Sequence, residues 1–125
     1  AALVIALSNH WAESVRRITK NPAIEVVANA VVVPEPDARL TPAPLDGRIL
    51  FLGRMGHAKG TFDLLDAFSR IVVHHPHASL HIGGDGDSIP VQQRIAQLGL
   101  EQHVRLLGWV RGDDKARELA QASVY

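Results

Sequence analysis

ILFLGRMGHAKG, residues 49–60, is the stretch that decides the fold. Its apolar start, residues 49–52, predicts a buried strand, and Gly53 and Gly60 let the backbone turn and approach a ligand closely. Arg54 and Lys59 place two cations at the mouth of that strand. Because a diphosphate concentrates negative charge in a small volume, we interpret this loop as a diphosphate-binding site. The plainer alternative is a loop with two solvated surface cations.

The loop is not a Walker phosphate-binding loop, because that motif needs glycine before lysine and then serine or threonine. Here Lys59 precedes Gly60.

Outward from this loop, strands and helices are expected to alternate. Strands are predicted at 3–7, 24–28, 48–53, 78–83 and 104–107, and another begins at Val124; helices are predicted at 9–19, 60–75, 88–98 and 113–122. This order predicts an α/β, Rossmann-like parallel sheet with helices on both faces. Ligands of such sheets bind beyond the carboxyl ends of the strands, which here are Gly53-Arg54, Gly83-Gly84 and Gly108-Trp109.

The domain organisation is indicated by a proline-rich segment. Residues 34–47 contain four prolines and no helical or alternating apolar pattern, which predicts a stiff linker. It divides residues 1–33 from residues 48–125. The chain begins within one apolar strand and ends at the start of another, so we expect it to be a fragment of a longer protein.

Composition excludes several classes of protein. The 125 residues hold 13 Lys plus Arg and 13 Asp plus Glu, so no net field favours nucleic acid or anionic lipid. The absence of cysteine excludes disulfides and thiolate chemistry. No apolar run approaches the ~20 residues of a membrane helix. We expect a cytoplasmic protein.

Other candidate residues have a structural alternative. Gly84 and Gly86 fit a tight turn as well as a ligand-facing loop, and Trp109 fits packing under a loop as well as stacking on a base or sugar. Asp113 and Asp114 suit the cap of a helix better than acid catalysis. The histidines at 74, 75, 77 and 81 have no acidic partner in sequence, and we expect no metal site.

These motifs together resemble the glycosyl transferases group 1 family (glycosyltransferase family 4), retaining enzymes of GT-B architecture with two Rossmann-like domains. Gly53-Arg54 with Lys59-Gly60 matches the family's G-R-x4-K-G, residues 80–86 its "l-x-i-x-G-x-G" segment, residues 104–110 its "V-x-f-l-G-x-v" segment, and residues 24–30 its entry to the interdomain linker.

The resemblance implies roles at the matching positions. Arg54 and Lys59 are expected to be catalytic, gripping the diphosphate of a nucleotide sugar as it leaves, without a metal or other cofactor. The residues expected to contact the donor are Gly53, Gly84, Gly86, Trp109, Val110 and Arg111.

The family's paired-glutamate motif would follow the strand that begins at Val124, and the acceptor-domain glycine loop would precede Ala1. We therefore expect this chain to carry part of a donor site and no turnover of its own. The parent would transfer a sugar to a carbohydrate, lipid or small-molecule acceptor, and peripheral membrane contact fits the family.

Two competing functions remain open on sequence. One is a non-catalytic nucleotide- or phosphate-binding module. The other is a dehydrogenase or epimerase, in which Asp85 would bind the ribose of a dinucleotide.

Overall fold

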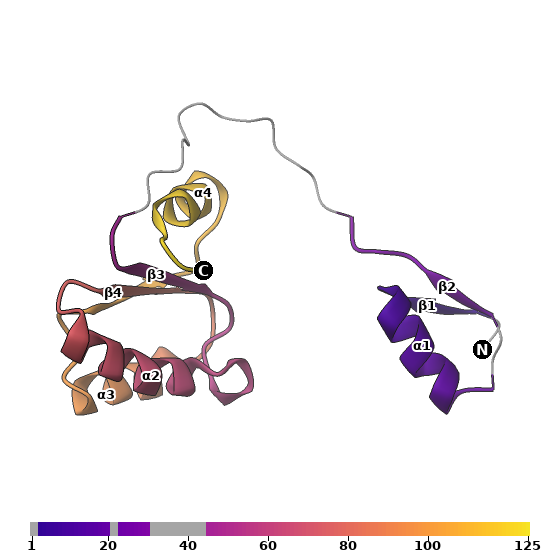
Figure 1. The fold of residues 1–125 in the computed structure, drawn as a ribbon, viewed down its shortest axis with the longest axis horizontal. Helices are drawn as coiled ribbons and strands as arrows, with labels where there is room; N and C mark the ends of the chain where they lie inside the picture. The colour runs from indigo at the N-terminus through magenta and orange to yellow at the C-terminus, as the bar shows by residue number, and fades with distance from the viewer. Residues whose placement is uncertain (1–2, 21–22, 31–44) are drawn as a thin grey trace. The chain divides into compact units, whose positions relative to one another are not determined.

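The computed structural model describes residues 3–20, 23–30 and 45–125. They form two compact units, one within Ala1–Glu35 and one within Pro36–Tyr125. Figure 1 shows the elements of each. Residues 34–44 of the predicted linker lie outside the described residues. Its last residues, 45–47, belong to the second unit, within which the Leu45 N–H donates to the Gln121 carbonyl at 2.9 Å.

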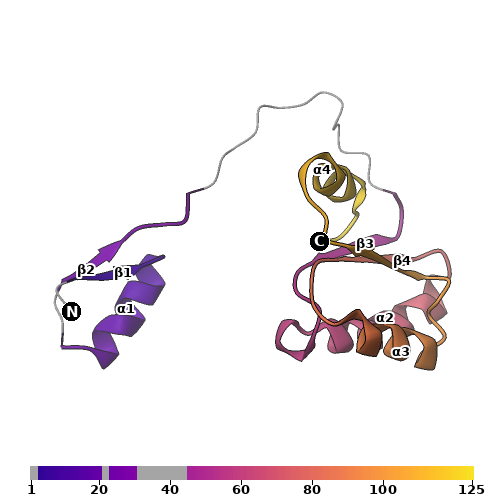
Figure 2. The same ribbon diagram turned by 180° about the vertical axis from the view of Figure 1, so that it is seen from behind.

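The first unit is a small β-α-β motif. Strands β1 (Val4–Ala6) and β2 (Ile24–Val26) are parallel, and helix α1 (Asn9–Ile18) connects them. The helix begins where the sequence predicts, because the Ser8 hydroxyl accepts a hydrogen bond from the Trp11 N–H at 3.2 Å. Figure 2 shows α1 against one face of the two strands.

The second unit is built on a parallel sheet with the order β3-β4-β5. Its strands are β3 (Arg48–Leu52), β4 (Ser79–Gly83) and β5 (Val104–Gly108). Ile49 of β3 also forms a parallel bridge with Val124, which agrees with the strand predicted to begin there.

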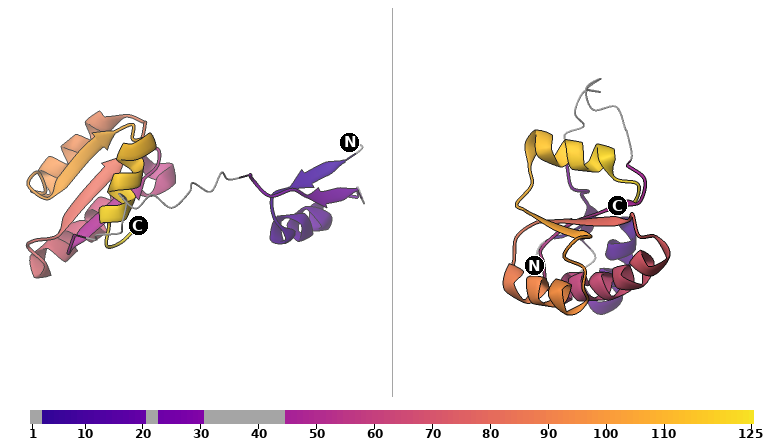
Figure 3. Two further views of the ribbon diagram at one scale, coloured as in Figure 1. Left: turned by 90° about the horizontal axis from the view of Figure 1, so that it is seen from above. Right: turned by 90° about the vertical axis from the view of Figure 1, so that its left-hand side faces the viewer.

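Helices cover both faces of this sheet. In Figures 1 and 3, α2 (Thr61–His74) and α3 (Ser88–Gln97) lie on one face, and α4 (Gly112–Gln121) lies on the other. The predicted α/β fold with helices on both faces is thereby confirmed. In the described part of the chain, no helix has the length and apolar character that crossing a membrane requires.

The two faces of the sheet receive alternate residues of β4. Leu80 and Ile82 point to the α2–α3 side and belong to its core, together with Leu65, Phe68, Val91 and Ile95. His81, between them, therefore points to the α4 side. Its register partner on β3 is Leu50, which is buried but lies outside that core.

Candidate functional site

A cavity of about 310 Å³ opens at the carboxyl ends of the three strands. The end of each strand and the first turn of α4 contribute to its wall. The lining residues are Leu52, Gly53 and Arg54 after β3, Gly83, Gly84 and Asp85 after β4, Trp109 and Val110 after β5, and Lys115 on α4. The structure therefore brings together five of the predicted site residues: Gly53, Arg54, Gly84, Trp109 and Val110.

The loop between β3 and α2 is held by its own hydrogen bonds. It contains a short 3-10 helix, η2 (His57–Lys59), and the Gly56 N–H donates to the Thr61 hydroxyl at 3.0 Å. The Thr61 N–H returns a bond to the Gly56 carbonyl at 3.2 Å, and Thr61 is fully buried. The His57 and Phe62 rings lie 4.3 Å apart. This bracing fixes the backbone between Arg54 and Lys59.

The two predicted cations occupy different places on this loop. Arg54 lines the cavity, whereas Lys59 lies at the end of η2, exposed, and is not among the lining residues. Among the described residues neither side chain has a carboxylate partner. By contrast, the Arg94 guanidinium in the same unit lies 2.6 Å from the Asp66 carboxylate. Arg54 and Lys59 therefore keep their charge available to an anion.

The loops after β3 and β4 pack backbone to backbone. The Met55 N–H donates to the Asp85 carbonyl at 2.7 Å, and Met55 and Gly86 form a parallel bridge. A Cβ on Gly84 would lie 2.0 Å from the Gly53 carbonyl oxygen, and one on Gly86 would lie 2.6 Å from that of Met55. Both positions have positive φ, +146° and +109°.

The packing of the two loops thus supplies a structural reason for glycine at 84 and 86. Gly84 also lines the cavity, whereas Gly86 does not.

The segment after β5 forms the opposite wall. Trp109 is 63% exposed, so its ring is not packed under a loop and remains available for stacking against a ligand. Val110 packs close to the sheet, since a Cβ on Gly83 would meet its Cγ2 at 2.8 Å. Arg111 is the exposed N-cap residue of α4 and does not line the cavity.

Lys115 is a cavity residue that the sequence reasoning missed. It lies in the first turns of α4, which starts directly after the β5 loop. Helical side chains lean toward the N-terminus of their helix, so a lysine here reaches back toward the strand ends. Its position shortly after Gly108-Trp109-Val110 was therefore the signal that could have identified it.

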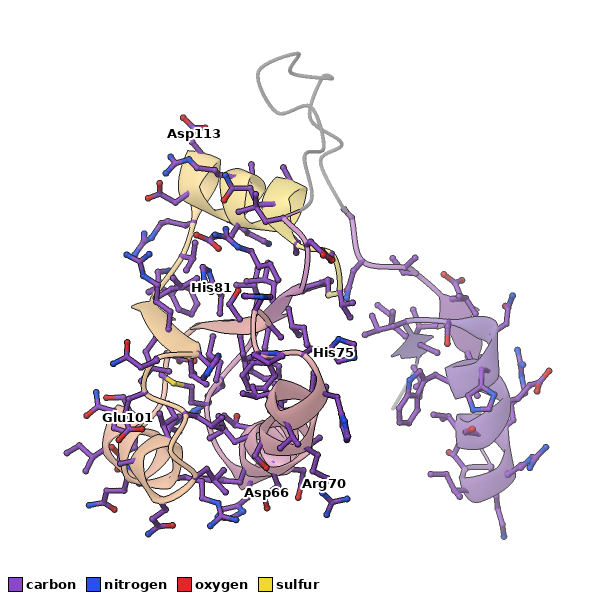
Figure 4. The ribbon with its side chains drawn as sticks, turned by 60° about the vertical axis from the view of Figure 1, so that its left-hand side comes forward. Asp66, Arg70, His75, His81, Glu101 and Asp113 are labelled. Atoms are coloured by element: carbon purple, nitrogen blue, oxygen red, sulfur yellow. The ribbon has the colours of Figure 1, made fainter. Side chains whose placement is uncertain are left out.

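The prediction for Asp113 and Asp114 can be compared with the structure of α4. Asp113 and Asp114 lie in the first turn of α4, but the N-cap residue is Arg111 and no side chain caps the helix. Their predicted place at a helix N-terminus is confirmed, but neither aspartate supplies a side-chain cap, because the helix starts one residue earlier than expected. Asp114 instead pairs with Arg117 at 2.8 Å, and Figure 4 shows Asp113 pointing away from the sheet.

The four histidines singled out in the sequence do not form one group in the structure. His74, His75 and His77 lie around the amino-end edge of the sheet, away from the strand ends. His81 instead contacts Glu118. Among residues 3–20, 23–30 and 45–125, no group of three histidine or acidic side chains is arranged to hold a metal ion.

Comparison with known proteins identifies a curated relative of part of this chain. Mannosylfructose-phosphate synthase of Agrobacterium fabrum is 33% identical in an alignment 75 positions long, which covers 53% of this chain and 16% of that protein. The chain thus spans about a sixth of the length of this curated relative.

Solved structures share the fold at low identity. TarM matches with a TM-score of 0.77 and 19% identity, covering 91% of this chain and 22% of that one. Anabaena Alr3699/HepE, solved with UDP and glucose, matches with a TM-score of 0.72 and 21% identity, covering 98% of this chain and 36% of that one. The pneumococcal O-GlcNAc transferase GtfA, solved with UDP and GlcNAc, has a TM-score of 0.76 and 15% identity over 89% of this chain and 23% of that one.

The match that decides the family covers nearly all of the described part of the second unit. It is to the model of the glycosyl transferases group 1, over residues 46–125, and the chain therefore belongs to that family.

Proposed function

We propose that the protein containing this chain is a retaining glycosyltransferase of family 4, which moves a sugar from a nucleotide diphospho-sugar to an acceptor. This chain supplies part of the donor site. The single observation that carries the proposal is a cavity at three parallel strand ends whose wall holds Arg54 and Lys115 without carboxylate partners in the described part of the chain.

The charges suit the chemistry of the leaving group. Breaking the bond at the anomeric carbon leaves negative charge on the departing diphosphate, and fixed cations stabilise that charge most where it develops. Arg54 offers a planar guanidinium for bidentate contact with phosphate oxygens. Lys59 lies beside the N-terminus of α2, where the helix dipole also favours an anion. We assign both residues to the diphosphate.

The remaining wall suits the rest of a nucleotide. Trp109 presents an exposed ring for stacking, and Gly53 and Gly84 contribute to the lining of the cavity. HepE and GtfA were solved with UDP, which supports a nucleoside diphosphate as the ligand here. Arg111 and Gly86 border the site without lining it, so we assign them a supporting place at its rim.

Metal independence is part of the proposal. Basic side chains can neutralise a leaving diphosphate in place of a divalent ion. We therefore expect transfer to continue in excess chelator. We also place the protein in the cytoplasm, with an acceptor that is a carbohydrate, a lipid or a small molecule; a lipid acceptor would bring peripheral membrane contact.

The decisive experiment is titration of the full-length protein with UDP and with GDP, followed by turnover with the matching nucleotide sugars. Arg54→Ala and Lys59→Ala should each lower turnover by about 10²–10³-fold, because each removes charge that stabilises the leaving group. The anomeric configuration of the product, read by NMR, tests retention.

Arg70→Ala is the matched control. Arg70 is an exposed cation on α2 that points away from the body of the unit in Figure 4. Its loss removes the same charge from the protein and should leave the rate within about two-fold. Near-normal rates for both Arg54→Ala and Lys59→Ala would refute the assigned roles.

The experiment also decides between the proposed enzyme and a non-catalytic binding module. A module predicts diphosphate binding that depends on Arg54 but no transfer of sugar by the full-length protein. The dehydrogenase alternative is not retained, because the chain belongs to a glycosyltransferase family.

A further inference from the structure

A charged network lies between the sheet and α4. The His81 Nδ1 is 2.9 Å from the Glu118 Oε2, and the same oxygen is 3.7 Å from the Arg48 guanidinium. Arg48 also donates to the Gln121 side-chain oxygen at 2.5 Å. Figure 4 shows His81 in the space between β4 and α4. The network therefore joins two strands of the sheet to one helix.

This network is a polar attachment of α4 to the sheet. The helix has no fully buried residue, whereas the side chains of His81, Arg48 and Glu118 are only 8%, 16% and 19% exposed. Polar groups withdrawn from water to this degree are costly unless they are paired. The Arg48 Nε is buried without a partner among the described residues, so part of that cost remains.

The network lies on the same face of the sheet as residues that line the proposed donor cavity. Alternate residues of a strand share a face, so Leu50 and His81 lie on the same face as the next pair, Leu52 and Gly83. Leu52 and Gly83 line the cavity. On α4, Lys115 precedes Glu118 by three residues, which places both on one side of the helix. One helix therefore connects the network to the wall of the cavity.

We infer that Glu118, His81 and Arg48 are positioning residues that hold α4 on the sheet and thereby fix the Lys115 ammonium in the wall of the donor cavity. This inference rests on the proposed function, since it assigns the network a part in binding the nucleoside diphosphate. The physical basis is that a cation binds an anion well only when its place is fixed before the ligand arrives.

A double-mutant cycle in the full-length protein tests this inference. The measured quantity is the Kd of UDP, or of GDP if that is the nucleotide bound, by calorimetry of four proteins: wild type, Lys115→Ala, Glu118→Ala and the double variant. Each single change should raise the Kd about ten-fold, the scale of one charge-assisted contact. Because Glu118 acts through Lys115, the double variant should lose little more than either single variant.

A merely structural role for Glu118 gives a different result. If the network only stabilised the unit, its loss and that of Lys115 would be independent, and the double variant would bind about a hundred-fold more weakly than wild type. That additivity, or an unchanged Kd for Glu118→Ala, would overturn the inference. Failure of wild type to bind either diphosphate would instead refute the proposed function, so the two failures are distinguishable.

Two further variants keep the test decisive if Glu118→Ala does not fold. His81→Asn places an amide N–H near the original Nδ1 and should keep the Kd within about three-fold of wild type, whereas His81→Leu should weaken binding about ten-fold. Equal Kd values for these two variants would overturn the inference.

Asp66→Asn is the matched control for the loss of an ion pair. It breaks the Asp66–Arg94 pair between α2 and α3, on the other face of the sheet, and should leave the Kd within about two-fold of wild type. A Kd rise for Asp66→Asn equal to that for Glu118→Ala would show a general loss of stability rather than positioning, and would also overturn the inference.

Discussion

The face of the sheet under α2 and α3 is closed by fully buried apolar side chains, whereas the face under α4 is closed by an ion-pair network. On the first face, Leu65, Phe68 and Leu80 are 0% exposed. On the second, α4 has no fully buried residue. The first face resembles an ordinary core, which supplies most of the free energy of folding.

The α4 face combines the attachment of the helix with the wall of the proposed donor cavity. At the carboxyl ends of the strands this side of the sheet borders the cavity, which is lined by Leu52, Gly83, Val110 and Lys115 among others. A packed apolar core there would leave no room for a ligand. Directional polar contacts hold a helix in one place without filling the space beside it. The difference teaches that one sheet can separate stability, on one side, from ligand geometry, on the other.

The largest effect is expected from Phe68→Ala on the apolar face. Phe68 is 0% exposed, and truncation of such a ring leaves a cavity, so the free energy of unfolding of the second unit should fall by about 4 kcal/mol. A urea titration followed by Trp109 fluorescence in a Trp11→Phe background measures it. Leu119→Ala, at a half-exposed position of α4, is the control and should cost about 0.5 kcal/mol. Equal losses would break the comparison of the two faces.

The next effect is expected at the carboxyl edge, where the α4 face opens into the cavity. Gly84→Ala should destabilise the second unit by about 3 kcal/mol and weaken diphosphate binding, because its methyl group would collide with the Gly53 carbonyl at a positive φ. Gly56→Ala separates strain from collision, since φ there is +145° but nothing lies within 4 Å of the new Cβ. Similar losses of unfolding free energy for both variants would mean that φ alone matters.

A smaller effect is expected for His81→Leu or Glu118→Leu on the α4 face. Each single change takes a hydrogen-bonding partner away from a group that is largely withdrawn from water and should cost about 2 kcal/mol. The double change to leucine should cost less than the sum, because it removes both polar groups together. Urea titration of the three variants measures the coupling. If the losses of unfolding free energy in the two single variants added strictly in the double variant, the two side chains would not stabilise each other.

The smallest effect is expected for the Asp66–Arg94 pair between α2 and α3. These side chains are 45% and 35% exposed, so water screens their attraction. Asp66→Ala should change the free energy of unfolding by only about 0.5 kcal/mol. A loss as large as that for Glu118→Leu would mean that ion pairs contribute equally on both faces of the sheet.

The order of elements and the strand ends of the site were predictable from short-range patterns. The apolar run 49–52 and glycines 53, 83 and 108 marked strand ends that the structure does bring to one cavity. The start of α4 was predicted one residue late, because the true N-cap residue, Arg111, has no capping side chain to recognise.

The pairing of distant residues was not predictable in this way. His81 has no acidic partner nearby in sequence, yet the residue is only 6% exposed and its side chain contacts a carboxylate 37 positions later in the chain. Gly84 was read as a turn or ligand-facing residue, while its closest restriction comes from the Gly53 carbonyl in a neighbouring loop. Both contacts depend on the order of the strands in the sheet, which brings distant parts of the chain together.

By itself, the sequence determined the α/β class, the parallel strands and the cations of the β3 loop, because periodicity, β-branched runs and glycine placement act over a few residues. Only the tertiary structure decided that Lys115 joins Arg54 in one wall while Lys59 lies outside it. It also decided that Glu118 finds His81 and Arg48. These arrangements follow from sheet order and helix packing, which join residues far apart in the chain.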